Sequence, residues 1–486
     1  MLNVDVIALI CEELEFGTSR CLDRTFRTTE DLNCRKGLLS LGLSSKTFLE
    51  PALGVLWRTL NSVEPLLSVL PETVSLNGKK MIMKQIALPS WDRLHYYASR
   101  VRIFKDDGTD NVHESVYAIL GQSKPIFPNL AQLLPGTQIC MYSLVFFLTS
   151  SISRAVIPSP YFPQSEHLDF GPSLALLASK SPGLRSLFIT TTQFSGISAS
   201  LRGFRELEAL HLGRLPQYEK DYIQSLASLT KLTYLNLTLL SDDSFDYVGL
   251  QTSFPSLKQL SIIGSSSELH NFLKIVTPLS LQILSLRWHG DPSIIDAIDV
   301  TTSLGRFSSL QNLDIDNATS LFVVDPDRER LWSLFNPLLK LTQIRSLRYS
   351  SPLFLTDQIT ATIASSWPHA ETLHFTAVSW SEIPPVSSLA HFARECPNLD
   401  YLQYPIQIDV SPGAADPIPP TPFMHPLRDF ICSVHYDVLD PLYVALSLHQ
   451  IFPSLKNVSG DGDKWDEVKA ILESYHLILA QNRRSI

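Results

Sequence analysis

One short phrase recurs along the chain and limits what it can fold into. The phrase is an apolar residue, two variable residues, Leu, one variable residue and a further apolar residue, as in LRSLFI or LTYLNL. Its clearest copies start at Leu184, Leu207, Leu232, Leu257, Leu281 and Leu310, with spacings of 23, 25, 25, 24 and 29 residues. Weaker copies start at Leu130, Ile152, Ile344, Ala370, Leu399, Leu427 and Leu455. Such regular self-similarity indicates stacked units that cannot bury their apolar sides without their neighbours.

The alternation inside the phrase predicts a short strand. Its last two apolar residues are two positions apart and face the same side, while the first turns inward from the preceding corner. Stretches with helical periodicity lie between the phrases, for example residues 269–276 and 329–341. The spacing resembles that of leucine-rich repeats, which implies an α/β repeat, a horseshoe-like solenoid over residues 101–486. The alternative is a series of unrelated α/β units with similar strands.

The two special segments of the array are a loop and a cap. Residues 411–426 contain six prolines in sixteen positions, which excludes a helix or a central strand and predicts an irregular loop. Residues 465–480 place Trp465, Val468, Leu472 and Leu479 on one helical face. We expect them to form a C-terminal capping helix.

The outward strand positions form the candidate binding surface for a protein of unknown identity. Aromatic and charged side chains of this kind are enriched at protein contacts. Every solenoid exposes a strand face, so the alternative is that these residues bind nothing specific. The predicted surface consists of His211, Tyr234, Asn236, Arg287, Asp314, Asp316, Arg348, His374 and Tyr401.

No catalytic, cofactor-binding or metal-binding motif is found. The chain has no phosphate loop, GxSxG, HExxH or Cys/His group with metal spacing. Acidic pairs at Asp314 and Asp316 and at Asp461 and Asp463 lack the later Glu of a calcium loop. We therefore expect no cofactor and no enzyme activity, although an unrecognised hydrolase is a rival class.

Charge and hydropathy restrict the partners. A net charge of −9 and no dense basic run argue against nucleic acid. The longest apolar run, residues 141–148, is too short to span a membrane, and the N-terminus carries acids where a secretory signal carries basic residues. The six cysteines are scattered, as in reduced proteins. These features predict a cytoplasmic or nuclear chain.

The N-terminal 62 residues read as a separate helical module. Val6, Ile10 and Leu14 share one helical face, and residues 43–60 carry apolar residues at three- and four-residue steps. Pro51 suits a first helical turn, so we expect a break between two helices near Leu49 and Glu50. Residues 18–35, of mixed charge, are expected to form a solvated insertion, and residues 63–100 a connecting helical segment.

Trp57 lies at the end of a segment too short to bury it. Either a partner covers it or it packs into its own domain, and the pattern favours neither. The surrounding sequence resembles an F-box. The second half of that motif reads Ser-Lys-x-Phe and then Leu-Trp-Arg-x-Leu, and the matches are Ser45, Lys46, Phe48, Leu56, Trp57, Arg58 and Leu60. Its first half is matched by Leu2, Asp5, Val6, Ile10 and Leu14, with Asn3 in place of the usual Pro.

An F-box followed by degenerate leucine-rich repeats resembles fungal-type F-box proteins. The resemblance implies a non-catalytic substrate-recognition adaptor of a Skp1–cullin–F-box ubiquitin ligase. In that family the F-box docks on Skp1, a cullin complex joins it, and the repeats hold the target protein. The resemblance assigns the Skp1 contact to Leu2, Val6, Ile10, Leu14, Phe48, Leu56 and Trp57. The alternative is a leucine-rich-repeat scaffold or interaction protein with no ubiquitin-ligase role.

Overall fold

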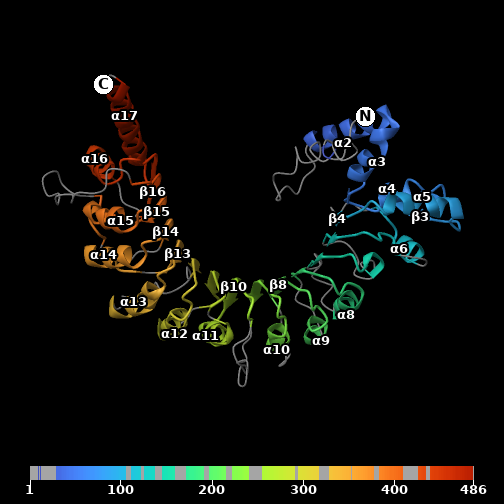
Figure 1. Cartoon of the computed structure of the whole chain (residues 1–486), viewed down its shortest axis with the longest axis horizontal. Coiled ribbons are helices and arrows are strands. Elements are labelled where there is room, and N and C mark those ends of the chain that lie inside the picture. Colours follow the sequence, from blue (N-terminus) through green and yellow to red (C-terminus); the bar gives the residue numbers. More distant parts are fainter. Residues whose placement is uncertain are drawn as a thin grey trace. The chain divides into compact units, whose positions relative to one another are not determined.

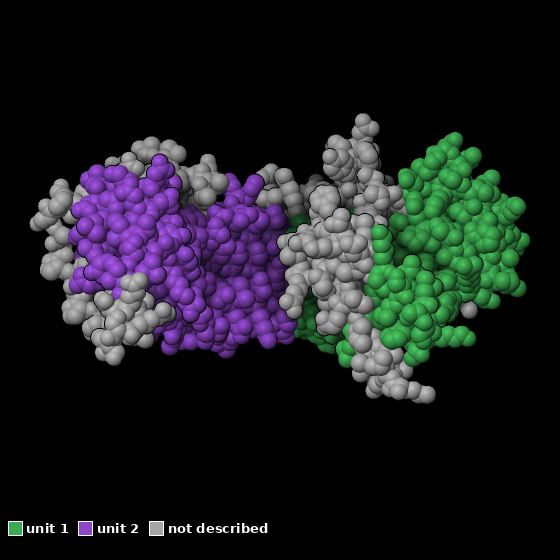
Figure 2. All heavy atoms as spheres, turned by 90° about the horizontal axis from the view of Figure 1, so that it is seen from above, with its two compact units in different colours: residues 1–232 green, residues 233–486 purple. Residues whose placement is uncertain are grey.

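The computed structural model divides the chain into two compact units, residues 1–232 and 233–486, coloured separately in Figure 2. We describe each by itself. The residues described are 9, 11, 29–105, 111–121, 125–136, 145–158, 171–190, 196–214, 222–239, 254–277, 279–290, 294–316, 328–351, 353–376, 383–408, 425–433 and 438–484. The predicted loop at 411–426 lies almost entirely outside them.

Unit 2 contains a ladder of parallel strands that follow one another in chain order. Each strand begins two residues after the start of a phrase, and this offset is the same for the strong and the weak copies. This register confirms the predicted repeat. The strands are β9 (Tyr234–Thr238), β10 (Gln259–Gly264), β11 (Ile283–Trp288), β12 (Asn312–Asp316), β13 (Ser346–Ser350), β14 (Thr372–Phe375), β15 (Tyr401–Tyr404), β16 (Asp429–Cys432) and β17 (Asn457–Ser459).

Helices return the chain between these strands and lie along one side of the ladder (Figure 1). They are α11 (Ser266–Ile275), α12 (Ile294–Leu304), α13 (Arg328–Phe335), η3 (Asn336–Lys340), α14 (Asp357–Ser366), η4 (Val386–Ser388), α15 (Leu389–Glu395), α16 (Pro441–Ile451) and α17 (Lys464–Arg484). The last of these, α17, packs on α16, which confirms the predicted final helix. Unit 2 is therefore an α/β repeat solenoid.

The core of unit 2 is a stack of identical positions. The second strand residue of each repeat is buried, and successive ones pair across the ladder from Leu235 through Leu260, Leu284 and Leu313 to Leu347. The first apolar residue of each phrase is buried as well, as expected of a corner residue. Further along, the second inward position becomes aromatic, and Tyr349, Phe375 and Tyr404 pack edge to face around Phe335 and Phe392.

Unit 1 contains parallel strands in the order β1, β4, β5, β6, β7, β8. Its strands are β1 (Thr59–Leu60), β4 (Ile103–Lys105), β5 (Gln132–Leu134), β6 (Arg154–Ile157), β7 (Ser186–Ile189) and β8 (Ala209–Arg214). Its helices are α2 (Thr29–Ser44), α3 (Lys46–Leu56), α4 (Glu64–Leu67), α5 (Leu88–Ala98), α6 (Glu114–Leu120), η1 (Val145–Phe147), α8 (Gly171–Lys180), α9 (Ile197–Leu201) and α10 (Tyr222–Ala227). Unit 1 thus combines a helical start with the same strand repeat.

The helical start differs from the sequence prediction in two ways. The break between α2 and α3 falls at Ser45, whose side chain accepts a hydrogen bond from the Thr47 amide, and not near Leu49 and Glu50. Pro51 lies inside α3, because the N-cap serine starts the helix one and a half turns earlier. In addition, α2 begins at Thr29, so the end of the expected insertion is helical.

The connecting segment is also not helical throughout. Thr73–Leu76 (β2) and Lys79–Ile82 (β3) form an antiparallel hairpin, with Asn77 and Gly78 at positive φ in its turn. Within the segment expected to be helical, the part around Trp91 is indeed a helix, α5. Thr59 and Leu60, expected at the end of a helix, instead pair with β4 as the first strand of the ladder. The Asn-Gly turn signal was present in the sequence, whereas a two-residue strand has too little pattern to predict.

Candidate functional site

The outward positions of unit 2 form three rows that cross its parallel strands. In the middle row, register pairs Asn236 with Ser261, Ser261 with Ser285, Ser285 with Asp314, Asp314 with Arg348, Arg348 with His374, and His374 with Gln403. A neighbouring row runs from Tyr234 to Tyr401, and a third contains Arg287 and Asp316. Strand alternation therefore brings predicted site residues that are far apart in sequence onto one face.

Two polar contacts fix the acidic part of this face. Arg287 donates from Nε to Asp316 Oδ2 at 3.0 Å, forming an ion pair between adjacent strands. Ser285 donates from Oγ to Asp314 Oδ2 at 3.4 Å. The other oxygen, Asp314 Oδ1, is buried and has no hydrogen-bond partner among the described residues. An unsatisfied buried acceptor of this kind costs free energy.

Arg348 is the cation at the centre of the same row. It is exposed on β13, between Asp314 on β12 and His374 on β14, and forms no ion pair or side-chain hydrogen bond within the described part of the chain. Burial lowers the pKa of His374, Arg348 lowers it further, and Asp314 partly opposes both. His374 is therefore neutral near pH 7, and Arg348 carries the positive charge of this row.

Tyr401 adds an aromatic side chain beside the charged row. Its ring centroid lies 6.1 Å from that of His374, and its hydroxyl donates to Gln403 Oε1 at 3.3 Å. Burial raises the pKa of Tyr401, with a smaller contribution from Asp429, while Arg348 opposes the shift. Tyrosine next to an exposed arginine is a common composition for an energetically important contact.

Asp314, Arg348, His374 and Tyr401 thus form one cluster, together with the Arg287–Asp316 pair on the next row. We call this set the polar cluster. Tyr234 and Asn236 lie on the same face but on β9, two strands before Arg287. Sequence reasoning missed Ser285 and Gln403, which occupy the same phrase position as Asp314 and His374. Phrase position alone could have identified both.

His211, the remaining predicted surface residue, lies in unit 1. It is half-buried on β8 and stacks on Phe188 of β7, with ring centroids 5.6 Å apart. Arg154 of β6 lies over the Phe188 ring, with its guanidinium carbon 5.2 Å from the ring centroid. Burial lowers the pKa of His211. It therefore belongs to a separate aromatic cluster.

The predicted Skp1-contact residues that are described lie partly inside their own module. Phe48 and Leu56 pack against a small core of Cys11, Leu38, Ala52 and Val55. Trp57 is half-buried, and its ring lies 4.6 Å from that of Tyr97 on α5. Leu2, Val6, Ile10 and Leu14 lie outside the described residues.

Three leucines of the helix pair are exposed. Leu39 is 52% exposed and Leu43 is 75% exposed, and their four-residue spacing places them on one face of α2. Leu49 of α3 is 37% exposed and lies against Gly42, where the two helices approach closely. We call Leu39, Leu43 and Leu49 the leucine face. Leu43 and Leu49 belong to the apolar pattern of residues 43–60, but the F-box resemblance assigns neither of them to the Skp1 contact.

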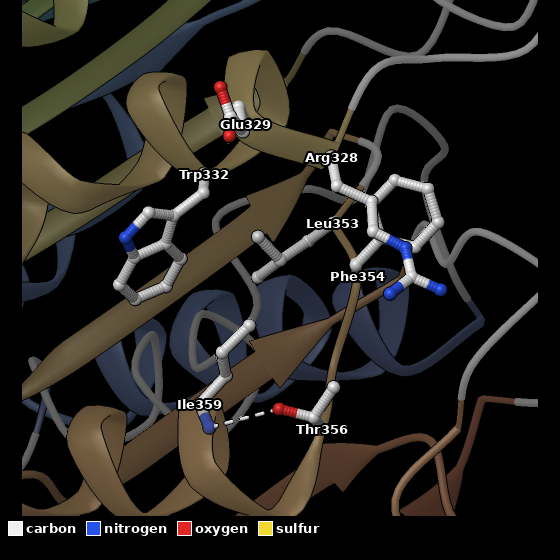
Figure 3. Close-up of a pocket in the computed structure, with 7 residues that line it drawn as sticks. All are labelled: Arg328, Glu329, Trp332, Leu353, Phe354, Thr356 and Ile359. Carbon is white, nitrogen blue, oxygen red and sulfur yellow. Dashed lines mark hydrogen bonds between the residues drawn. The ribbon is translucent and has the colours of Figure 1, made fainter.

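A shallow pocket in unit 2 lies beside α13 and the start of α14 (Figure 3). Its volume is about 220 Å³, and its lining is mostly apolar, from Trp332, Leu353, Phe354 and Ile359. The Arg328 guanidinium lies over Phe354, 5.4 Å from the ring centroid, and the Ile359 amide donates to Thr356 Oγ1. Because ligand pockets usually exceed roughly 300 Å³, this hollow does not by itself indicate a small-molecule site.

The described residues also bear on metals, thiols and membranes. They contain no group of three or more His, Cys, Asp or Glu side chains arranged to hold a metal ion. Within the same ranges, no helix has the length and apolar character needed to cross a bilayer. Cys11, Cys396 and Cys432 are free and buried, and burial raises the pKa of Cys396 to about 12.

Comparisons with known proteins yield one similar solved structure and no matching family or curated sequence. No protein family signature matches the chain, and no curated protein sequence matches it. Among solved structures, the chain is similar to the crystal structure of the leucine-rich repeat-containing protein LegL7 from Legionella pneumophila. The identity is 14%, the TM-score is 0.34, and the match covers 71% of this chain and 97% of that chain. The repeat geometry described above comes from the strand register and does not depend on this likeness.

Proposed function

We propose that this protein is a substrate-recognition adaptor of a Skp1–cullin–F-box ubiquitin ligase. In this proposal the leucine face of α2 and α3 docks on a Skp1-like adaptor, and the polar cluster of unit 2 contacts the target protein. The leucine face carries the proposal, because it is exposed while the same two helices already possess a buried core. A cytoplasmic or nuclear location of the protein is part of the same proposal.

The leucine face requires an explanation that the module's own folding does not supply. Single exposed leucines are common, but neighbouring ones on one helix pair mark a contact surface. The motif resemblance falls on the same segment, residues 43–60. The half-buried Phe48, Leu56 and Trp57 would then support the docking surface from the side of the module's own core.

Contacts between α3 and the following elements support an adaptor that holds its docking helices firmly. Glu50 accepts hydrogen bonds from the Tyr96 hydroxyl and from Arg100, whose guanidinium lies over the Tyr96 ring. The Arg58 carbonyl accepts from the amides of Arg102 and Ile103, both at 2.9 Å. A firmly held docking module raises the effective concentration of a bound target near the ligase.

The polar cluster supports a protein partner rather than a reaction. Arg348 offers an exposed charged donor, and Asp314 lies one strand away in the same row. Tyr401 supplies the apolar contact area that such a charged surface otherwise lacks.

The test is direct binding of the purified chain to a purified Skp1-like adaptor from the same organism, measured by titration calorimetry. We expect the wild type to bind and the double variant Leu39→Glu with Leu43→Glu to lose at least about tenfold in affinity, since two apolar contacts become charged. Leu88→Glu is the matched control, because Leu88 is 80% exposed at the start of α5 and lies outside the leucine face.

Circular dichroism should show the same helix content for all three proteins, because each altered leucine is exposed. If the wild type does not bind the adaptor, the ubiquitin-ligase role is wrong. The protein is then a repeat scaffold or interaction protein. If the double variant binds as tightly as the wild type, the docking surface lies elsewhere and the leucine face is wrongly assigned.

A further inference from the structure

A stacked group of side chains lies on the outward strand face of unit 1, and the proposed function does not use it. Strand register aligns Val156 of β6, Phe188 of β7 and His211 of β8 in one outward row. Arg154 of β6 pairs with Ser186 of β7, whose small side chain lets the arginine lean diagonally over Phe188. We call Arg154, Phe188 and His211 the stacked cluster.

The stacked cluster holds a cation whose hydrogen-bond donors are available. The guanidinium carbon of Arg154 lies 5.2 Å from the Phe188 ring centroid, and the Phe188 and His211 rings stack with their planes inclined by 22°. Arg154 is exposed, and within the described residues its side chain forms no ion pair and no hydrogen bond. The ring contact therefore restrains the guanidinium and leaves its N–H groups available to an acceptor from outside.

The charges around the stacked cluster distinguish Arg154 from its neighbour. Arg185, one residue before β7, forms an ion pair with Glu208, and the two side-chain atoms are 3.7 Å apart. Burial lowers the pKa of His211, so that ring is neutral near pH 7. Arg154 is therefore the charged member of the stacked cluster, and it has no anion of its own within the described part of the chain.

We propose that the stacked cluster binds an acidic segment of a partner polypeptide, in which a Glu or Asp carboxylate lies next to an aromatic or large aliphatic side chain. The Arg154 guanidinium presents parallel N–H donors that match the two oxygens of a carboxylate. Phe188 and Val156, both half-buried, supply apolar area for the neighbouring side chain. This site is separate from the leucine face and the polar cluster, and it does not depend on the ubiquitin-ligase role.

The single cation determines the kind of anion that fits. Phosphate groups carry close to two negative charges at neutral pH and are usually held by several arginines. The stacked cluster has one guanidinium, which compensates one carboxylate. Because the net charge of −9 repels acidic molecules from the chain as a whole, binding of an acidic segment requires a local site of this kind.

The experiment measures fluorescence anisotropy of a labelled octapeptide that repeats Glu-Glu-Phe-Phe, titrated with the full chain at pH 7.5. The comparison probes repeat Lys-Lys-Phe-Phe and Glu-Glu-Ser-Ser. We expect saturable binding of the acidic aromatic probe, and binding at least about tenfold weaker for the other two. Non-specific attraction to an acidic chain would favour the lysine probe. Equally tight binding of that probe, or no saturable binding of the acidic aromatic probe, would overturn the proposal.

Substitutions separate the guanidinium from charge alone. Arg154→Gln should weaken binding of the acidic aromatic probe at least about tenfold, and Arg154→Lys should recover only part of that loss, because an ammonium lacks the fork of N–H groups. Arg205→Gln is the control, because Arg205 is exposed in the turn before β8 and its replacement removes the same charge. Unchanged binding by Arg154→Gln, or equal weakening by the control, would overturn the proposal.

Hydrogen exchange on the wild type locates the binding without any variant. The acidic aromatic probe should slow amide exchange in β6 and β7, and protection confined to unit 2 would contradict the site. If a variant fails to fold, as judged by circular dichroism, this measurement still decides the question.

Sedimentation velocity tests the rival occupant, a second copy of this chain. We expect the wild type to sediment as a monomer, because the proposed occupant is an acidic segment of another protein. A wild-type dimer that Arg154→Gln dissociates would show that the stacked cluster is a contact between copies, and it would overturn the proposal.

Discussion

At the scale of single residues, the buried His425 shows how one side chain links repeats. Its Nε2 donates to the Cys396 carbonyl at 2.9 Å, and its Nδ1 accepts from the Leu427 amide at 3.2 Å. Burial lowers the pKa of His425, and the hydrogen bond to Cys396 partly opposes this. The neutral form is therefore the one that fits, because a proton on Nδ1 would face the Leu427 N–H.

This arrangement predicts a pH dependence of stability. The folded-state pKa of His425 lies below the unfolded value of about 6.5. The contribution of His425 to stability is therefore complete above about pH 6.5, and it is lost as the pH falls from there through the lower, folded-state pKa. His425→Gln should lower the free energy of unfolding at pH 7.5 by about 1–3 kcal/mol. Urea denaturation at pH 7.5 and 5.5 should show a smaller acid-induced loss in the variant than in the wild type. Equal losses would refute the assignment.

The strand alternation predicts opposite outcomes for adjacent residues on β10. Leu260 is fully buried, and its replacement by Ala should lower the free energy of unfolding by about 2–5 kcal/mol through lost contacts and a cavity. Ser261 faces outward, and Ser261→Ala should change it by less than about 0.5 kcal/mol. Urea denaturation compares them. Similar effects at both positions would contradict the inward and outward assignment.

At the scale of elements, the cap of α11 shows how a returning helix is started. Ser265 Oγ accepts from the Glu268 amide, while Glu268 Oε2 accepts from the Ser265 amide at 2.8 Å, forming a capping box. Ser265→Ala should destabilise unit 2 by roughly 1 kcal/mol, measured by urea denaturation. Ser267→Ala, in the same first turn, is the control, because it removes only the 3.2 Å contact between the Ser267 and Ser265 hydroxyls and leaves both bonds of the capping box in place. A loss no larger than that of the control would show that the cap is dispensable.

Elements also show what the sequence could and could not predict. The phrase located every strand from β5 to β17, including weak copies, because inward leucines recur with the period of a strand and a corner. The break between α2 and α3 was misplaced because Pro51 is a strong helix-start signal, whereas the N-cap Ser45 governs the actual start. The polar cluster could be found residue by residue, but its pairing depends on register, which the sequence alone does not state.

At the scale of the whole molecule, the proposed adaptor has two independent contacts, the leucine face and the polar cluster. The most direct test is quantitative proximity labelling in cells, with and without proteasome inhibition, using wild type, the Leu39→Glu and Leu43→Glu double variant, and Arg348→Glu. Arg348 is exposed, so the last change should alter binding without altering folding.

We predict that the wild type labels a Skp1-like adaptor together with target proteins that accumulate on proteasome inhibition. The double variant should lose the adaptor and keep the targets, and Arg348→Glu should keep the adaptor and lose the targets. Wild-type labelling that contains no Skp1-like adaptor, or a target set that does not respond to proteasome inhibition or to either change, would contradict the account.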